Sequence, residues 1–294
     1  MISILIPIYN FNASNLLQEL FEQSKLIKDK VEIIIYDDHS NVFENVNRIT
    51  AKKLNFDYSY LANNIGRSKI RNMMANKATS DYLLFLDGDI LPKSKKFIQN
   101  YLDEIESDTE VIYGGRIHVP DERHQNKLRW KYGYFKEDKT PEQRQKKPYL
   151  SLVSNNLLIR KTLFKSIYFE ESLTTYGHED TLLAIQLKAR KCNCVHIYNP
   201  VIHQDIDEND VFIDKTESAL KNLMAIHKTH QLQMNEIKIL KVYKSIERFK
   251  LKSIAFNLFR LLEKPLKFHL IKNKSNLFLL DVYKLGYFIK ISRS

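Results

Sequence analysis

The sequence contains few of the residues that build loop-rich or disulfide-bonded folds. Among its 294 residues, 7 are glycine and 7 are proline, and its only cysteines are Cys192 and Cys194. Two cysteines this close in the chain cannot form a disulfide framework, and no other cysteine occurs to complete a zinc site. We expect both to be reduced residues of a buried segment in a cytosolic protein.

Long apolar runs and glycine-rich phosphate loops are also missing. No uninterrupted apolar stretch approaches the ~18 residues of a membrane-spanning helix, and the N-terminus lacks a signal-peptide pattern. Neither G-x-G-x-x-G nor G-x-x-x-x-G-K-[S/T] occurs, which argues against a nicotinamide dehydrogenase and a P-loop ATPase. We expect an intracellular protein in which a metal ion and cations such as Arg67 and Arg71 hold any bound phosphate.

The excess of positive charge is confined to one end of the chain. The net charge is +11, but residues 221–294 hold 16 Lys+Arg against 4 Asp+Glu, whereas the preceding 220 residues hold 30 against 31. This change in composition predicts a boundary near residue 220. Because 44% of the residues are hydrophobic, a sizeable core is expected. We predict one domain over residues 1–220 and a basic, helical region over residues 221–294.

Two carboxylates follow directly after a predicted buried strand. Residues 82–86 form a short apolar run, and Asp87, Gly88 and Asp89 come next. Ligands of open α/β sheets bind at the carboxyl ends of strands, and paired aspartates suit Mg²⁺ or Mn²⁺. The alternative interpretation is a plain turn, because Asp-Gly is a common turn pair.

Strand and helix patterns alternate through the first half of the chain. Strands are expected at residues 3–8, 31–36, 58–61 and 80–87, and helices start near Ser14, at residue 67 and, behind Pro92, over residues 93–105. Such alternation predicts an α/β fold with a mainly parallel sheet between helices. Three of the strands end in polar residues, which favours a nucleotide site: Tyr9 and Asn10, Asp37 and Asp38, and Asp87 and Asp89.

The second half contains a long polar segment and two further candidate positions. Residues 120–149 predict either a lid over the substrate or a solvated loop. Glu179 and Asp180 open a helix, where they either complement its dipole or supply a general base for an acceptor hydroxyl. His203 follows a short strand and is either a structural histidine or a metal ligand.

Several motifs in this order resemble family 2 glycosyltransferases with the GT-A fold, a Rossmann-like architecture. The resemblance covers about residues 1–205, and residues 116–150 lack its pattern. The motifs are SILIPIYN, IIIYDDHS, NNIGRSKIRN, LFLDGD, SNNLLIRKTLF and FEESLTTYGHEDTLLAIQL.

The resemblance implies a role for each matching residue. On the donor side, Pro7 and Tyr9 flank the nucleotide base, Asp38 bonds the base, usually uracil, and Arg71 and Asn72 lie beside the phosphates. Asp87 and Asp89 match the DxD motif, in which the first acid reaches the ribose or metal-bound water and the second binds Mn²⁺ or Mg²⁺. His203 matches a histidine that completes the metal shell, and Asp180 matches the catalytic base, with Glu179 beside it at the acceptor site.

The expected function is that of an inverting, metal-dependent hexosyl- or N-acetylhexosaminyltransferase. Its donor would be a nucleotide-diphosphate sugar such as a UDP-sugar, and its acceptor a glycan or lipid-linked glycan of cell-surface polysaccharide or lipopolysaccharide synthesis. The alternatives are a nucleotidyltransferase and a non-catalytic nucleotide-sugar or membrane-binding protein on the same fold. No glycine-rich activation loop supports the former, and a binding protein would have no use for both Asp89 and Asp180.

The basic C-terminal region has an amphipathic helical pattern over residues 236–262. Apolar residues including Ile239 and Tyr243 follow one stripe, and lysines including Lys238 and Lys241 follow another. This pattern favours peripheral contact with an anionic membrane at the inner face of the cytoplasmic membrane. Nucleic acid, which we do not expect as a partner, and simple packing on the catalytic domain are the alternatives.

Overall fold

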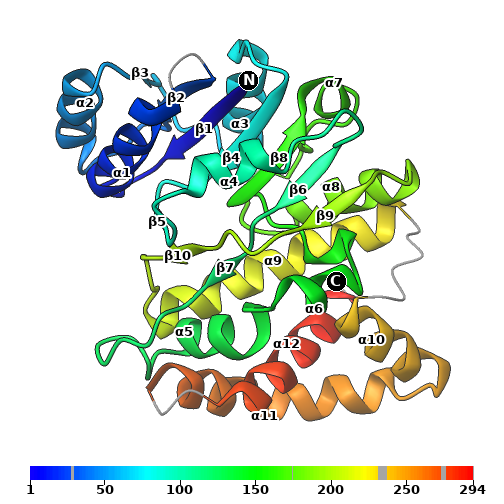
Figure 1. The fold of residues 1–294 in the computed structure, drawn as a ribbon. Helices are drawn as coiled ribbons and strands as arrows, with labels where there is room; N and C mark the ends of the chain where they lie inside the picture. The colour runs from blue at the N-terminus through cyan, green and yellow to red at the C-terminus, as the bar shows by residue number, and fades with distance from the viewer. Residues whose placement is uncertain (28–29, 174, 231–236, 273–275, 294) are drawn as a thin grey trace. The chain divides into compact units, whose positions relative to one another are not determined.

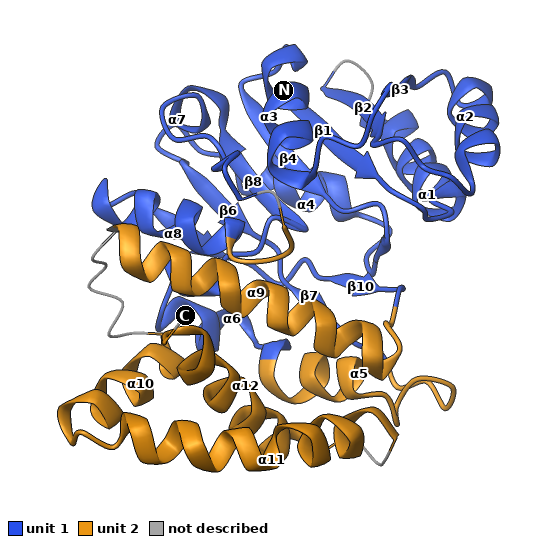
Figure 2. Ribbon diagram, turned by 180° about the vertical axis from the view of Figure 1, so that it is seen from behind, with its two compact units in different colours: residues 1–119, 137–174, 179–205 blue, residues 120–136, 175–178, 206–294 orange. Residues whose placement is uncertain are grey.

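The structure is a computed structural model that describes all residues except 28–29, 174, 231–236, 273–275 and 294. The chain forms two compact units, which are coloured separately in Figure 2. Unit 1 comprises residues 1–119, 137–174 and 179–205, and unit 2 comprises residues 120–136, 175–178 and 206–294. The boundary predicted near residue 220 falls inside helix α9 (Asn209–His230).

A seven-stranded sheet forms the centre of unit 1 (Figure 1). The strand order is β3-β2-β1-β4-β8-β6-β9, and every neighbouring pair is parallel except those of β8 with β4 and with β6. This confirms the predicted α/β fold with a mainly parallel sheet. The strands are β1 (Ile2–Ile8), β2 (Val31–Asp37), β3 (Asp57–Tyr60), β4 (Tyr82–Leu86), β6 (Val111–Tyr113), β8 (Asn156–Arg160) and β9 (Cys194–His196).

Helices cover both faces of this sheet because its central strands are apolar on both sides. In β1, Ile4 and Ile6 pack with helices α1 (Ser14–Ser24), α2 (Glu44–Lys53) and α4 (Phe97–Asp103). Leu5 points the other way and packs with α3 (Arg67–Lys77), α7 (Lys161–Phe164) and α8 (Glu179–Ala189). Burying each such side chain contributes about 1.5–3 kcal/mol, so the two layers hold α3 and α8 firmly against the sheet.

A small second sheet in unit 1 has the order β5-β10-β7. It consists of β5 (Ile90–Pro92), β7 (Arg116–Ile117) and β10 (Val201–His203). Pro92 therefore ends a strand instead of opening a helix, and the helix expected over residues 93–105 is limited to Phe97–Asp103. Strand β10 pairs antiparallel with β5, and this register places His203 opposite Ile90, next to Asp89.

The segment over residues 120–149 is largely helical, although its polar composition indicated a loop. It contains α5 (Leu128–Tyr132), a π-helical turn (Gly133–Glu137) and α6 (Pro141–Gln145), and it is followed by a 3₁₀ turn (Tyr149–Ser151). In α6, the Thr140 side chain accepts from the Gln143 backbone N–H, and the Gln143 side chain accepts from the Thr140 N–H. This capping box satisfies two backbone donors and starts the short helix.

A further 3₁₀ turn (Lys25–Ile27) follows α1.

Unit 2 is built from α9 with α5, α10 (Lys238–Arg248), α11 (Lys252–Lys272) and α12 (Leu277–Ile291). A single helix over residues 236–262 was expected, but the chain breaks after α10, where Lys250 has φ +59°, and α11 continues through Pro265. Residue 236 itself lies outside the described residues. Gly286 of α12 lets Phe259 of α11 approach closely, because a Cβ there would lie 2.0 Å from its ring. Among the described residues, no helix has the length and apolar composition needed to cross a membrane.

Candidate active site

Unit 1 brings the predicted acids together at the carboxyl end of β4. Asp87 and Asp89 follow β4, and Gly88 between them lies against the end of β1. A Cβ on Gly88 would lie 3.1 Å from Ile8 Cγ1 and 3.2 Å from the carbonyl oxygen of Pro7. Because only glycine fits without displacing β1, the acids are held beside the segment that carries Pro7 and Tyr9.

Asp89 and His203 form a close pair that fits a divalent cation. The Nε2 atom of His203 lies 3.3 Å from Oδ2 of Asp89. Burial raises the pKa of Asp89, but the charges of His203 and Arg67 and the His203 contact outweigh it and hold the pKa below its usual range. The Oδ1 atom of Asp89 is buried and has no hydrogen-bond partner among the described residues. A buried carboxylate oxygen without a partner suits a metal ion.

The predicted metal ligands do not form a complete shell by themselves. Within the part of the chain that the structure describes, no group of three or more His, Cys, Asp or Glu side chains is placed to hold a metal ion. Asp87 is instead bound by Arg71. A divalent ion on Asp89 would therefore need ligands from a bound substrate or water, as Mg²⁺ sites at phosphates commonly have.

Arg71 of α3 is a buried cation that anchors Asp87. Its Nη2 atom lies 2.5 Å from Oδ1 of Asp87, and its guanidinium carbon lies 5.6 Å from the ring centre of Phe169. Asn72 holds the backbone of Phe169, because its side chain donates to the Phe169 carbonyl at 2.9 Å and accepts from the Phe169 N–H at 3.0 Å. Arg71 thus points at Asp87, whereas Asn72 positions Phe169, whose ring lies against the Arg71 guanidinium.

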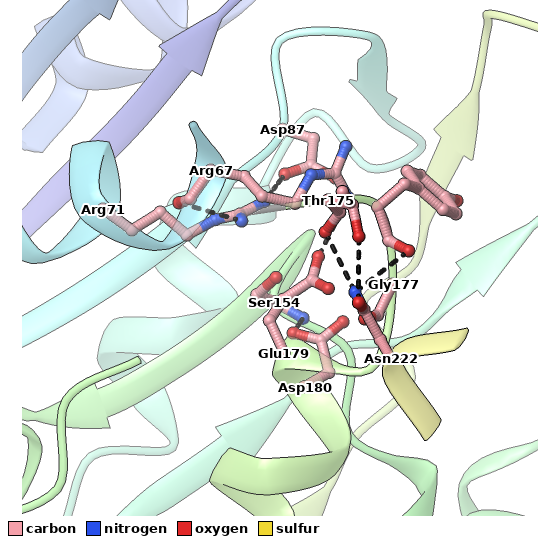
Figure 3. A network of polar contacts seen from close by, with 10 residues as sticks. Arg67, Arg71, Asp87, Ser154, Thr175, Gly177, Glu179, Asp180 and Asn222 are labelled. Atoms are coloured by element: carbon pink, nitrogen blue, oxygen red, sulfur yellow. Dashed lines mark hydrogen bonds and ion pairs between the residues drawn. The ribbon is translucent and has the colours of Figure 1, made fainter. Parts of the chain in front are cut away.

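Two carboxylates at the start of α8 have opposite environments (Figure 3). Burial raises the pKa of Glu179, but Arg67 and Arg71 outweigh it and lower the pKa, with Arg67 Nη1 2.9 Å from Glu179 Oε1. Burial and the neighbouring Glu179 charge raise the pKa of Asp180 to about 6. The Ser154 backbone N–H donates to Asp180 Oδ1 at 3.1 Å and orients the carboxylate. Neighbouring acids whose pKa values are pushed apart are typical of acid–base sites.

Most of the sequence that forms this sheet and these residues matches a known protein family. The family described as "Glycosyl transferase family 2" matches residues 3–168, which is more than half of the chain. The chain belongs to glycosyl transferase family 2. No curated protein sequence matches it.

Solved structures of similar fold include a mannosyltransferase, S. aureus TarS and a glucosyl-3-phosphoglycerate synthase. Mannosyltransferase PcManGT from Pyrobaculum calidifontis is 12% identical with a TM-score of 0.60, over 99% of this chain and 85% of that chain. S. aureus TarS is 20% identical with a TM-score of 0.52, over 76% of this chain and 39% of that chain. Glucosyl-3-phosphoglycerate synthase from Mycobacterium tuberculosis is 14% identical with a TM-score of 0.52, over 78% and 79%. At these identities the likeness shows the GT-A fold.

In this family 2 glycosyltransferase, the other predicted donor residues lie around the ends of β1 and β2. Tyr9 is exposed beyond β1, and Pro7 is half-buried. Asp38 is buried, and its two oxygens accept backbone N–H groups from Ile65 at 2.7 Å and Gly66 at 3.0 Å. Burial raises the pKa of Asp38 in spite of these hydrogen bonds. The carboxylate fixes the turn that starts α3 and so aligns Arg67 and Arg71.

Asn222 of unit 2 is a residue that the sequence patterns did not identify. Within unit 2, its Nδ2 donates to the carbonyl oxygens of Thr175, Tyr176 and Gly177, and its Oδ1 accepts from the Thr175 hydroxyl (Figure 3). Gly177 and His178 both have positive φ, +99° and +72°. These contacts keep a strained backbone in place directly before the two acids of α8. The long separation in sequence hides this contact.

Asn155 is a second residue that was missed. It lies between Ser154 and the first residue of β8 and is fully buried. Neither its Oδ1 nor its Nδ2 has a hydrogen-bond partner among the described residues. Buried amide groups without partners are rare in native proteins, and they concentrate where a ligand or water completes the site. In the sequence, the only indication of this site is the pair Asn155 and Asn156 directly before the apolar residues 157–159.

Proposed function

We propose that this chain transfers a sugar, a hexose or N-acetylhexosamine, from a UDP-sugar to a hydroxyl of a glycan or lipid-linked glycan. The observation that supports this most is the raised pKa of Asp180 in the unit that also presents Asp87 and Asp89. A base for an acceptor and acids for a diphosphate donor are the two requirements of direct glycosyl transfer. The acceptor would belong to cell-surface polysaccharide or lipopolysaccharide synthesis.

The donor nucleotide would bind at the ends of β1 and β2. Pro7 and exposed Tyr9 would contact the base, and Asp38 would bond it through lone pairs that its backbone contacts leave available. Arg71 with Asp87 would face the ribose and phosphates, and Asn72 would support Arg71 from beneath. The mannosyltransferase relative is described in complex with GDP-Man and TarS in complex with UDP, which agrees with a nucleotide site on this fold.

Asp89, His203 and Asp87 are the residues that would hold Mn²⁺ or Mg²⁺. The unpartnered Oδ1 of Asp89 is the ligand atom that the structure favours most. A divalent ion bound there neutralises negative charge on the departing diphosphate. Structures of the mannosyltransferase relative and of the mycobacterial synthase are described with Mn²⁺.

Asp180 would act as general base in a single displacement. The acceptor oxygen forms a bond to the anomeric carbon, the bond from that carbon to the phosphate oxygen breaks, and Asp180 takes the acceptor proton. Arg67 keeps Glu179 ionised, and the charge of Glu179 in turn keeps Asp180 basic. The product has inverted configuration because attack and departure occur on opposite faces of the sugar.

The C-terminal region would attach the enzyme peripherally to the inner face of the cytoplasmic membrane. Helix α11 exposes apolar side chains along one face: Ile254 (67%), Leu258 (56%), Leu261 (74%) and Phe268 (63%). Arg260 and Lys264 are exposed on the same helix. An exposed apolar stripe with cations suits an anionic lipid surface, because side chains enter the lipid while charges meet headgroups. Nucleic acid would use the cations but leave the apolar stripe in water.

The experiment that tests the proposal measures release of nucleoside diphosphate from a panel of nucleotide sugars with Mn²⁺. We expect the wild type to release one diphosphate and the Asp180→Asn variant to release none, while calorimetry still detects that diphosphate in both. If the variant loses nucleotide binding together with turnover, Asp180 has a structural role. If no nucleotide sugar is consumed by the folded wild type, the transferase proposal is wrong.

A further inference from the structure

The small sheet of unit 1 places two histidines side by side next to Asp89. The antiparallel register of β10 with β5 brings His203 beside Asp89. On its other edge, β10 pairs in parallel with β7, and Ile202 lies opposite Ile117. The residues that follow these two, His203 and His118, are therefore neighbours as well. Their ring centres lie 5.6 Å apart with the planes tilted by 49°, a distance at which aromatic rings pack against each other.

Asp138 fixes His118 at two points. Its Oδ2 accepts from the backbone N–H of His118 at 2.6 Å, and its Oδ1 lies 2.8 Å from the ring atom Nδ1. Because a carboxylate oxygen accepts, Nδ1 is the donor of that hydrogen bond. The His118 side chain is also fully buried, which prevents the ring from turning into solvent. The imidazole of His118 is therefore held in one orientation.

His203 lacks the hydrogen bond that usually orients a metal-binding imidazole. Its Nε2 lies 3.3 Å from Oδ2 of Asp89, whereas its buried Nδ1 has no hydrogen-bond partner among the described residues. A histidine that binds a metal almost always donates its other ring N–H to a carboxylate, a carbonyl or water. Without such a bond, the orientation of the His203 ring depends on the groups that pack against it. The fixed ring of His118 is one of these groups.

We propose that His118 is a positioning residue of the metal site. Held by Asp138, its ring keeps His203 in the orientation in which Nε2 faces Asp89. This role rests on the metal ion of the proposed function and needs no bond between His118 and that ion. Residues that orient metal ligands typically contribute about 10–100-fold to metal affinity, so a loss of this size is expected when His118 is removed.

The contacts of His118 also stabilise the chain locally. His118 and its partner carboxylate join the two ends of residues 120–136, which belong to unit 2. Arg116 and Glu137 join the same ends, with Arg116 Nη2 2.6 Å from Glu137 Oε2. In the described part of the chain, neither of these two forms an ion pair or a ring contact with His203. Breaking the pair of Arg116 and Glu137 is therefore a matched control for the structural effect.

Binding of Mn²⁺ to the full chain tests the role of His118. It is measured by electron paramagnetic resonance, with Mn²⁺ alone and with UDP, GDP, CDP or ADP. We expect His118→Ala to weaken Mn²⁺ binding about 10–100-fold, whereas His118→Phe retains a ring against His203 and should recover most of the affinity. Asp138→Ala, at a partly exposed position, frees the His118 ring without emptying its space and should weaken binding less than His118→Ala. Glu137→Gln, the control, should bind Mn²⁺ like the wild type.

Urea unfolding without metal establishes which variants are folded, and three results would overturn the positioning role. Unchanged affinity in His118→Ala and Asp138→Ala would show that the ring does not orient His203. Equal weakening in Glu137→Gln would assign the loss to the ends of residues 120–136. An affinity of His118→Phe as low as that of His118→Ala would show that a nitrogen atom of His118 is needed instead of its ring. If His118→Ala does not fold, the comparison of Asp138→Ala with Glu137→Gln decides.

The sugar-transfer assay on the same samples separates this role from the proposed function. If Mn²⁺ binding depends on His118 but no nucleotide sugar is consumed, the transferase proposal fails and the positioning role stands. If the wild type consumes a nucleotide sugar and the His118 variants bind Mn²⁺ like the wild type, only the positioning role fails. A folded wild type that binds no Mn²⁺ under any of these conditions overturns the positioning role whatever the sugar assay shows.

Discussion

Activity should increase about tenfold between pH 5 and pH 7, because Asp180 must be ionised to accept the acceptor proton. Burial and the charge of Glu179 raise the pKa of Asp180 from 3.8 to about 6. With this pKa, the ionised fraction is about one tenth at pH 5 and about nine tenths at pH 7. Glu179→Gln removes the repelling charge, so we expect its acid limb to shift to lower pH.

The same shift predicts that Asp180→Asn stabilises the fold at neutral pH. Because folding raises the pKa of Asp180, the folded state favours the protonated carboxyl. The carboxyl therefore contributes stability below its unfolded pKa, and this contribution is lost as the pH rises through about 6. At about 1.4 kcal/mol per unit, the shift corresponds to at most about 3 kcal/mol. Asp180 is partly exposed, so solvent screening reduces the expected gain to about 1–2 kcal/mol. An asparagine Oδ1 can still accept from the Ser154 N–H.

Two assays check this prediction. Nucleoside diphosphate release is measured from pH 5 to 8, and urea unfolding of wild type and Asp180→Asn is compared at pH 7.5 and pH 4.5. The stabilisation should be present at the higher pH and shrink at the lower one. A variant that is less stable than wild type at pH 7.5, together with a wild-type rate that does not change across this range, would show that the pKa of Asp180 is not raised.

Three further predictions follow from packing and charge. Arg71→Ala should lower the free energy of unfolding by about 3 kcal/mol, measured in urea, and weaken nucleotide binding, because it removes the buried partner of Asp87; unchanged stability would contradict the ion pair. Gly177→Ala should lower kcat with little change in donor KM, because the residue has φ +99° and the new Cβ would lie 2.6 Å from Ala219 Cβ. Adding Ala219→Gly removes that clash and should restore part of the rate, so a double variant without any recovery would argue against the contact. Leu258→Glu with Leu261→Glu should reduce co-flotation with anionic vesicles several-fold, whereas Val211→Glu should not; equal loss in the control would count against a specific α11 face.

Local patterns in the sequence were sufficient for the sheet and for the acids that follow its strands. Apolar runs such as residues 82–86 identify strands because a strand buried on both faces has no polar position. The alternation with helices gives the parallel order, and the order brings Asp38 and Asp87 to the same edge of the sheet. The family resemblance, confirmed by the match over residues 3–168, supplied the expected roles.

Contacts between distant segments could not be read in this way. The pairing of His203 with Asp89 depends on the register of β10 with β5, which are short strands without a distinctive pattern. Asn222 stands in no motif of the sequence, and only the structure shows that its side chain donates to three backbone carbonyls about 45 residues earlier. Of the apolar stripe predicted within residues 236–262, Tyr243 of α10 is buried, whereas Val242 and Phe249 are exposed. The exposed apolar side chains continue on α11, at Ile254, Leu258 and Leu261. Periodicity shows that a helix has an apolar face but not whether another helix covers it.

Thermal unfolding of wild type and of Asp89→Ala with a panel of nucleoside diphosphates, with and without Mn²⁺, tests the proposed donor site directly. A ligand present at 100 times its Kd stabilises the native state by about 2.7 kcal/mol, which raises Tm by several degrees. We predict that one diphosphate, UDP, raises the Tm of the wild type only with Mn²⁺, and that Asp89→Ala abolishes this rise. The absence of any metal-dependent rise with the folded wild type would contradict a nucleotide-sugar donor site.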